Sequence, residues 1–131
     1  NPKDKGILVM QYMLLIYNDP ALQPAYGTPE FQAMMGGYFS ANEKMKSDGV
    51  LRAGESLHGI ETATSLNMKS GKIETMDGPF AETKEVLGGF AIFEFATREE
   101  ALAALESFMG LHREHWPEWE GESELRQIME F

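Results

Sequence analysis

Apolar residues run almost without interruption over two short segments of the chain, from Gln11 to Tyr17 and from Phe90 to Phe95. The first run stops at a turn-forming Asn-Asp-Pro sequence, and the second follows a polar, glycine-containing stretch. Short apolar runs bounded by turn residues are typical of strands buried on both faces. We therefore predict that these two segments form the central strands of a sheet.

Two longer segments carry apolar residues at helical spacing. The first opens at Thr28, which is suited to cap a helix, has Pro29 at the first helical position, and ends near a Ser-Asp-Gly stop. The second opens at Thr97, where Glu100 completes a capping-box pattern, and Pro117 ends it at the latest. Each segment predicts one amphipathic helix.

The segment between the first helix and the second apolar run predicts shorter strands. Val50 to Leu57 has the pattern of a strand with Gly54 as a candidate bulge. Two alternating segments, Thr62 to Lys69 and Lys72 to Met76, flank Ser70-Gly71. Alternating segments separated by two such residues predict a hairpin.

The last segment, from Ser123 to Phe131, alternates apolar and polar residues as an outer strand does. In chain order the elements are strand, helix, strand, inserted hairpin, strand, helix and strand. This order predicts an α+β fold of split β-α-β type, with both helices on one face of an antiparallel sheet. No third helix remains for the other face, so we predict a homodimer built sheet against sheet; the alternative is a solvated second face.

The composition restricts the classes of function. A chain of 131 residues is long enough for one hydrophobic core, and no stretch approaches the roughly 20 apolar residues of a membrane-spanning helix. We therefore expect no membrane partner. A net charge of -10 repels phosphate backbones, so we also expect no nucleic-acid partner. The absence of cysteine excludes disulfides and thiolate chemistry and suits the cytoplasm.

The first nine residues, Asn1 to Val9, lack the pattern of a secretory signal. They precede the first strand-like residue, Met10. We therefore expect residues 1–9 to be a leader or an added segment, and residues 10–131 to be the folded domain.

The segment from Met76 to Phe90, Met-Asp-Gly-Pro-Phe-Ala-Glu-Thr-Lys-Glu-Val-Leu-Gly-Gly-Phe, resembles the signature of the DGPF group of YCII-related proteins. Gln11 to Tyr17, Gly54 to Leu57 and Glu124 to Arg126 are also similar to the family's pattern. The resemblance implies a ferredoxin-like β-α-β-β-α-β domain with the hairpin inserted, assembled as a dimeric α+β barrel with a cleft. This agrees with the fold that the residue pattern predicts.

Two features depart from that family pattern. The wider family has a histidine and aspartate pair with the histidine in or near the first helix, whereas the predicted first helix here has no histidine. The pair is therefore not carried over. DGPF proteins commonly end in Glu-Val-Arg-Pro, and this chain has Glu124-Leu125-Arg126-Gln127 in that place.

The signature segment carries most of the candidate catalytic residues. Asp77 is a candidate general acid/base or ligand anchor, because Pro79 lacks the N–H that an aspartate two positions earlier in a turn usually binds. Glu82 and Lys84 would form the polar end of the cleft, and His58 is a candidate base near neutral pH. The alternatives are a turn-forming aspartate, an exposed charged loop and a solvated histidine.

The candidate ligand-binding residues are Phe80, Glu85, Tyr17 and Arg126. Pro79 restricts the residue before it, so we expect Gly78 to be extended and the tetrapeptide to be stiff. A stiff segment would hold Asp77 and Phe80 in a fixed relation, as one wall of the cleft.

The two histidines near the end of the second helix are weaker candidates. His112 and His115 are three residues apart, a spacing that can direct two imidazoles to one side, with Glu118 as a third ligand. Pro117 disrupts the spacing, and the chain has no known metal motif or phosphate-binding loop. We predict no metal site and no bound cofactor.

Three functions are compatible with these residues. The first is an enzyme that acts on a small organic molecule by carboxylate acid/base chemistry without a cofactor. The second is a ligand-binding or regulatory partner protein without turnover; the resemblance implies a link to an alternative sigma factor. The third is a purely structural dimer, which leaves the signature segment unexplained.

Overall fold

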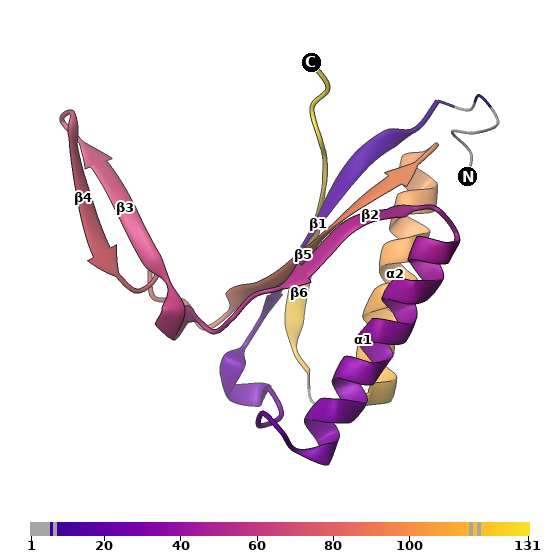
Figure 1. Ribbon diagram of the computed structural model, residues 1–131, viewed down its shortest axis with the longest axis horizontal. Coiled ribbons are helices and arrows are strands. Elements are labelled where there is room, and N and C mark those ends of the chain that lie inside the picture. Colours follow the sequence, from indigo (N-terminus) through magenta and orange to yellow (C-terminus); the bar gives the residue numbers. More distant parts are fainter. Residues whose placement is uncertain (1–5, 7, 116, 118) are drawn as a thin grey trace.

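The computed structural model of the protein describes residue 6, residues 8–115, residue 117 and residues 119–131 (Figure 1). Its elements follow the predicted order. The strands are β1 (Met10–Asn18), β2 (Leu51–Ser56), β3 (Thr64–Lys69), β4 (Lys72–Asp77), β5 (Val86–Phe95) and β6 (Gly121–Gln127). The long helices are α1 (Pro29–Ser47) and α2 (Arg98–His115), and the loops contain two short 3-10 helices, η2 (Pro20–Leu22) and η3 (Ile60–Thr62).

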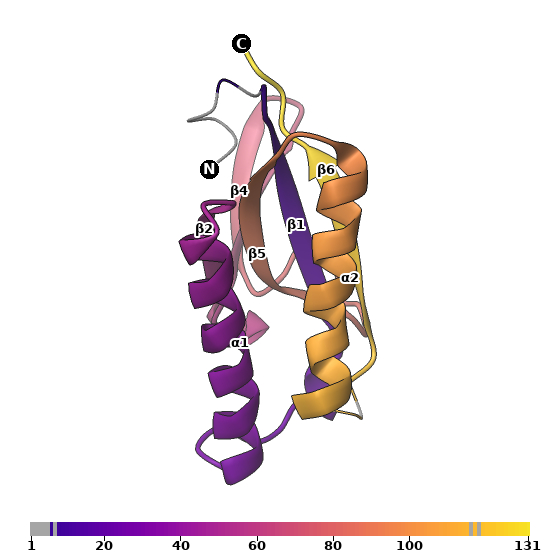
Figure 2. The ribbon, with the colours of Figure 1, turned by 90° about the vertical axis from the view of Figure 1, so that its right-hand side faces the viewer.

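Four of the strands form one antiparallel sheet in the order β2-β5-β1-β6. The central pair is β1 and β5, as the two apolar runs predict, and β6 is an outer strand that ends at Gln127 instead of Phe131. Both helices lie on the same face of this sheet (Figure 2). The predicted α+β, ferredoxin-like class is confirmed, and the dimeric barrel stays a prediction.

The starts of both helices follow from side-chain capping. Thr28 Oγ1 accepts a hydrogen bond from the Phe31 N–H at 3.2 Å, and Thr97 Oγ1 accepts one from the Glu100 N–H at 3.1 Å. These N–H groups have no partner inside the helix, so the capping oxygens satisfy donors that would otherwise be lost. Both predicted caps are confirmed.

The hydrophobic core lies between the sheet and the helices. Alternate residues of a strand point to opposite faces, and on the helix side the core residues are buried. They are Tyr12 and Leu14 of β1, Ala91, Phe93 and Phe95 of β5, and Ala101 of α2. Leu14, only 1% exposed, lies at the centre of this layer.

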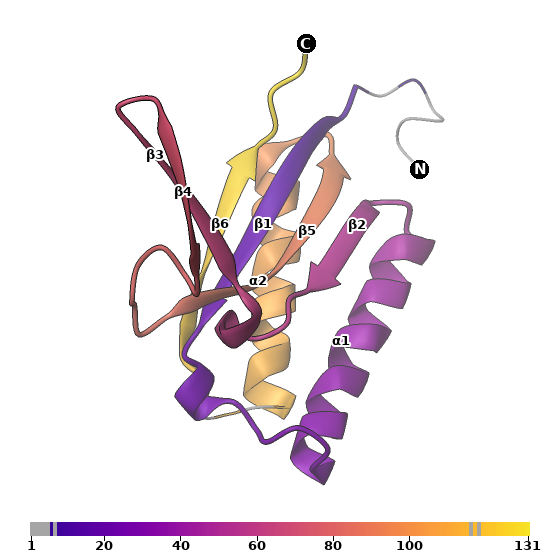
Figure 3. The same cartoon turned by 60° about the vertical axis from the view of Figure 1, so that its left-hand side comes forward.

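The hairpin of β3 and β4 forms a separate two-stranded sheet that projects away from the rest of the protein (Figure 3). Its turn has positive φ at both central residues, 52° at Ser70 and 78° at Gly71. Two positive φ values are the mark of the primed turn that matches strand twist. The predicted hairpin is confirmed, and we call residues Thr64 to Asp77 the arm.

The bulge expected at Gly54 is wrong. The register between β2 and β5 shifts between Leu51 and Ala53, so the irregular residue is Arg52, and Gly54 pairs regularly with Ala91. A bulge turns a side chain out of the regular alternation, which here allows Arg52 to reach Glu94.

The predicted boundary before Met10 stays a prediction, because residues 1–5 and 7 lie outside the described residues. Among the residues that the structure describes, no helix has the length and apolar character needed to cross a membrane.

Candidate functional site

The face of the four-stranded sheet opposite the helices is apolar along its centre. We call its five central residues the floor: Met13, Leu15 and Tyr17 of β1, and Phe90 and Ile92 of β5. Met13 is paired with Ile92, and Leu15 with Phe90. All five are half-buried, whereas Tyr12, Leu14, Ala91 and Phe93 on the helix side are buried. In Figure 3 the sheet lies in front of α2, so this face is turned toward the viewer.

A buried charge stands at one end of the floor. The carboxylate of Glu94 belongs to a residue only 6% exposed and accepts a hydrogen bond from Arg52 Nη2 at 2.8 Å. Gln11 Nε2 donates to its other oxygen at 3.4 Å. A carboxylate is removed from water at acceptable cost only when it is paired and hydrogen-bonded, and these partners meet that condition.

The guanidinium of Arg52 is partly open to solvent, since its side chain is 38% exposed while that of Glu94 is 7% exposed. Arginine has five N–H donors, and the bond to Glu94 uses one of its forked nitrogens. The Arg52 guanidinium is therefore a cationic donor that Glu94 holds beside an apolar surface. Sequence reasoning missed both residues, although Glu94 is the only charged residue in the apolar run of β5.

The opposite edge of the same face is acidic. Along β6, Glu122 is paired with Tyr17, Glu124 with Leu15, and Arg126 with Met13. We call Glu122 and Glu124 the acidic rim; both are exposed. Arg126 Nε lies 3.7 Å from Glu124 Oε2, but with side chains 72% and 53% exposed this pair is screened by water and contributes little.

Two of the predicted ligand-binding residues, Tyr17 and Arg126, lie on this face, one in the floor and one beside it. Arg126 is paired with Met13, which lies four residues before Tyr17 along β1. Four residues of a strand span about 13 Å, so Tyr17 and Arg126 are not neighbours. The other six predicted site residues are not on strands of the four-stranded sheet. They are Asp77, Phe80, Glu82, Lys84, Glu85 and His58.

The signature segment leaves the base of the arm. Asp77 ends β4 opposite Thr64 and is exposed, and Phe80 is 89% exposed. A ring that open to solvent does not form a wall within one chain. Removing a ring costs several kcal/mol of stability only when the ring is buried. We therefore expect no such loss for Phe80→Ala in the isolated protomer.

Gly78 has a positive φ of 99°, so the expectation of ordinary extended backbone there is wrong. Glycine adopts this conformation without the clash that a Cβ would cause. The conformation closes the base of the arm: the Gly78 N–H donates to the Ala63 carbonyl at 2.7 Å, and Ser65 Oγ donates to the Gly78 carbonyl at 2.7 Å. This part of the signature is thus a structural joint.

The remaining predicted residues lie in loops. Glu82 and Lys84 are exposed, and Glu85 is half-buried just before β5. His58 is exposed in the loop between β2 and η3. Their catalytic and ligand-binding roles stay predictions.

On the helix side, a histidine that sequence reasoning treated as a weak metal candidate has a different role. His112 of α2 is 4% exposed, and its Nδ1 lies 3.2 Å from the Met109 carbonyl, which can only accept. Nδ1 therefore carries the proton, and Nε2 accepts from the Tyr38 hydroxyl of α1 at 2.6 Å. Burial lowers the pKa of His112, which the backbone hydrogen bond to Met109 opposes, and burial raises the pKa of Tyr38. The pair is a neutral bond between the two helices.

Aromatic rings enclose this bond. Phe108 stacks on Tyr38 with ring centroids 5.8 Å apart, and Trp119 lies 4.0 Å from the His112 ring. The side chain of His115 and all of Glu118 lie outside the described residues. Among those described, no group of three histidine, aspartate or glutamate residues could hold a metal ion.

Comparison with known proteins adds two findings. The sequence profile of the YCII-related domain matches residues 10–109. An uncharacterized protein of Rhizobium meliloti (strain 1021) is 36% identical over 93 residues, which is 71% of this chain and 75% of that protein.

Proposed function

The chain belongs to the YCII-related family, also known by the name DGPF, and from this premise we propose that it forms a homodimer that binds a small organic molecule on the open face of its sheet. The observation that carries the proposal is the Arg52–Glu94 pair, a built and half-open charged group at the end of an apolar floor. Small-molecule sites typically combine mostly apolar lining with a few fixed polar groups.

The homodimer is supported by the floor itself. Both faces of the β1–β5 pair carry large apolar residues, and only one of these faces has helices over it. A second copy placed sheet against sheet would cover the floor and leave a narrow space between the two layers for a ligand. Light scattering coupled to gel filtration should give twice the chain mass of 14.7 kDa at micromolar concentration.

The chemistry of the site favours a ligand with an anionic or carbonyl oxygen and an apolar body. Arg52 supplies N–H donors to the oxygen, and the floor supplies apolar contact. The charge that Glu94 places behind Arg52 holds the guanidinium in position rather than competing for the ligand, because its carboxylate is buried. In this proposal the protein acts in the cytoplasm, and turnover would use Asp77, Glu82, Lys84 or His58 brought to the ligand.

The test is a thermal-shift screen of small carboxylates and carbonyl compounds against the wild type and three variants. A ligand that binds only the folded state raises the melting temperature by mass action. Arg52→Gln should weaken the binding of each hit by about tenfold or more, since a charge-assisted hydrogen bond is lost. Glu94→Gln should weaken it less, and Lys46→Gln on α1 should leave it unchanged.

Hits that bind wild type and Arg52→Gln equally would contradict the site, and a monomer mass would contradict the dimer. Incubating each hit with the protein and analysing it by mass spectrometry then separates turnover from binding.

A further inference from the structure

The arm is amphipathic, although among the described strands β3 and β4 pair only with each other. Residues that face each other across an antiparallel pair share one side, so the pairs Leu66–Thr75 and Met68–Ile73 lie on one side of the arm. Leu66, Met68 and Ile73 are 67%, 68% and 62% exposed. The pairs Ser65–Met76, Asn67–Glu74 and Lys69–Lys72 lie on the other side, where Met76 is the one large apolar side chain. Three large apolar side chains thus form one exposed stripe.

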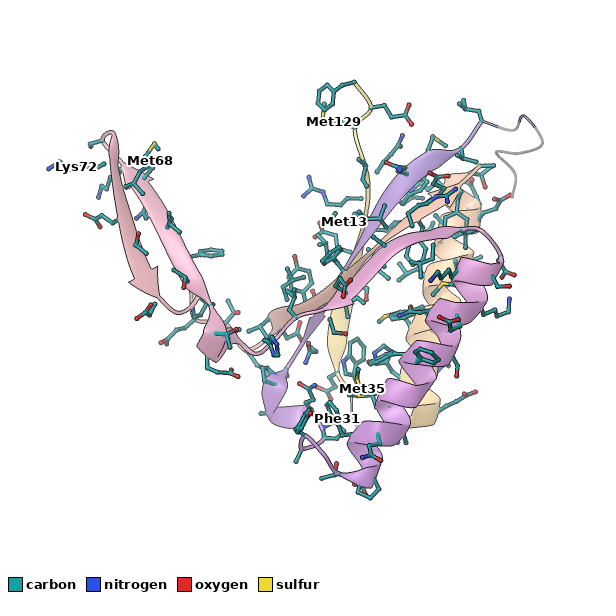
Figure 4. The ribbon with its side chains drawn as sticks, viewed as in Figure 1. Met13, Phe31, Met35, Met68, Lys72 and Met129 are labelled. Carbon is teal, nitrogen blue, oxygen red and sulfur yellow. The ribbon has the colours of Figure 1, made fainter. Side chains whose placement is uncertain are left out.

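The stripe is turned toward the side of the sheet that the helices leave open. The arm lies on that side (Figures 1 and 2), and at its tip Met68 points toward the sheet while Lys72 points away (Figure 4). The two hydrogen bonds of Gly78 close the base of the arm. A two-stranded hairpin is marginally stable in water unless its apolar side packs on something.

The charges at the tip also lack an opposite charge among the described residues. Lys69 and Lys72 face each other directly, an arrangement of like charges that is destabilising. Neither lysine has an ion pair among the described residues. Both belong to a chain of net charge -10, so the tip is a local cationic patch on an acidic protein.

The acidic rim is the complementary surface. Glu122 and Glu124 are exposed on the edge strand, at the border of the face that we propose to be the dimer interface. Two such faces brought together would also bring their carboxylates together, which costs free energy unless cations lie between them. The arm carries two lysines and projects on this side of the sheet.

We propose that the arm docks on a second copy of the chain with its apolar stripe. The long side chains of Lys69 and Lys72, which leave the opposite side of the arm at its tip, reach around the edge of the hairpin to the partner's Glu122 and the partner's Glu124. This inference rests on the proposed homodimer. By symmetry both arms make the same contact, so each dimer contains two clasps. The arm thereby fixes which face of the partner is used, which an apolar floor alone does not specify.

A charge-swap experiment tests the clasp, with dimer dissociation followed by sedimentation at low salt. One variant combines Lys69→Glu and Lys72→Glu, and the other combines Glu122→Lys and Glu124→Lys. Each alone has two repulsive clasps, so its dissociation constant should rise about tenfold or more. In an equimolar mixture, the heterodimer has two attractive clasps, one wild-type and one reversed, and should regain wild-type affinity within about threefold.

A control variant with Lys44→Glu and Lys46→Glu, on exposed positions of α1, changes the net charge equally and should dimerise like the wild type. An arm-less variant, in which Asn-Gly joins Thr64 to Asp77 in place of residues 65–76, should fold but dimerise at least about tenfold more weakly. The replacement suits this site because Thr64 and Asp77 are already paired.

The outcomes separate the two proposals. A monomeric wild type overturns both the homodimer and the clasp. A dimeric wild type whose affinity is the same in the charge-reversed and arm-less variants overturns the clasp alone. A third outcome is also possible: dimer affinity recovers when all four reversals are placed in one chain but not when the two variants are mixed. This would show that the arm contacts the rim of its own chain.

Discussion

The two faces of the central strands contain the same kinds of residue but differ in how deeply those residues are buried. Leu14 and Leu15 are neighbours in β1; the first is 1% exposed under the helices and the second is half-buried in the floor. Phe93 and Phe90 of β5 differ in the same way. On the helix side the chain completes its own core, whereas on the open side it presents an apolar surface with fixed charges at its border.

This difference bears on where the proposed recognition of a second molecule would take place. Burial against α1 and α2 needs only apolar residues of suitable size. The open side instead holds charged groups at defined positions: the Arg52–Glu94 pair, the acidic rim and the lysines of the arm. Groups of that kind are typical of surfaces that recognise a second molecule.

The two faces should respond differently when the same side chain is removed from each. Leu14→Ala should lower the free energy of unfolding by about 2–5 kcal/mol, because it removes buried methyl groups and leaves a cavity. Leu15→Ala should cost less than about 1.5 kcal/mol in dilute protein, where the floor is half exposed. Urea unfolding followed by circular dichroism measures both.

The variants Leu14→Ala and Leu15→Ala also test whether a second copy covers the floor. If a second copy covers the floor, the cost of Leu15→Ala should grow with protein concentration, because stability is then linked to dimerisation. The cost of Leu14→Ala should not. Equal and concentration-independent losses for the two variants would contradict the distinction between the faces.

A smaller effect is expected at the bond that joins the helices. Tyr38→Phe keeps the ring that stacks on Phe108 but leaves His112 Nε2 without its donor. An unsatisfied buried acceptor costs about 1–3 kcal/mol, and thermal unfolding should show this loss. Tyr17→Phe, on the open face, is the matched control and should leave the stability nearly unchanged. Equal melting temperatures for Tyr38→Phe and the wild type would mean that the bond contributes nothing.

The pH dependence of stability should be smaller again and should come from the same histidine. Burial lowers the pKa of His112, so below the ordinary value of about 6.5 the unfolded chain binds a proton that the folded chain does not. The stability from neutral His112 is therefore complete above about pH 6.5 and is lost as the pH falls through the lowered folded value. His112→Gln should flatten the dependence of the melting temperature on pH between about pH 7 and 5.5. Equal slopes for wild type and His112→Gln would contradict this origin.

Most of the fold could be predicted because its signals are local. The caps at Thr28 and Thr97, the Ser70-Gly71 turn and the two apolar runs each depend on a few adjacent residues. The unbroken apolar character of β1 also predicts, correctly, that both its faces would be apolar. It does not say which face the helices cover.

The candidate site could be predicted only in part, because its contacts are distant in sequence. Arg52 and Glu94 are brought together by the pairing of β2 with β5 and by a bulge at Arg52. The sequence predicts this bulge at Gly54 instead, because glycine is typical of bulges. Tyr38 and His112 meet through helix packing, which no spacing within one helix reveals. The signature segment predicts one wall of a cleft, and this stays a prediction; what the structure adds is that Gly78 closes the base of the arm.

The smallest effect is expected at the tip of the arm, farthest from the core. Ser70 has a φ of 52°, which asparagine tolerates better than serine, so Ser70→Asn should stabilise the hairpin slightly or leave it unchanged, within about 0.5 kcal/mol. The turn is exposed and the clasp uses the lysines on either side of it, so dimer affinity should also stay the same. Thermal unfolding and sedimentation measure the two quantities on the same sample. Lys69→Asn, one position away on the strand, is the matched comparison: it should leave folding intact and weaken the dimer. If Ser70→Asn itself weakened the dimer, the partner would have to contact the turn, and the stripe and the lysines would not be the only parts of the arm that recognise it.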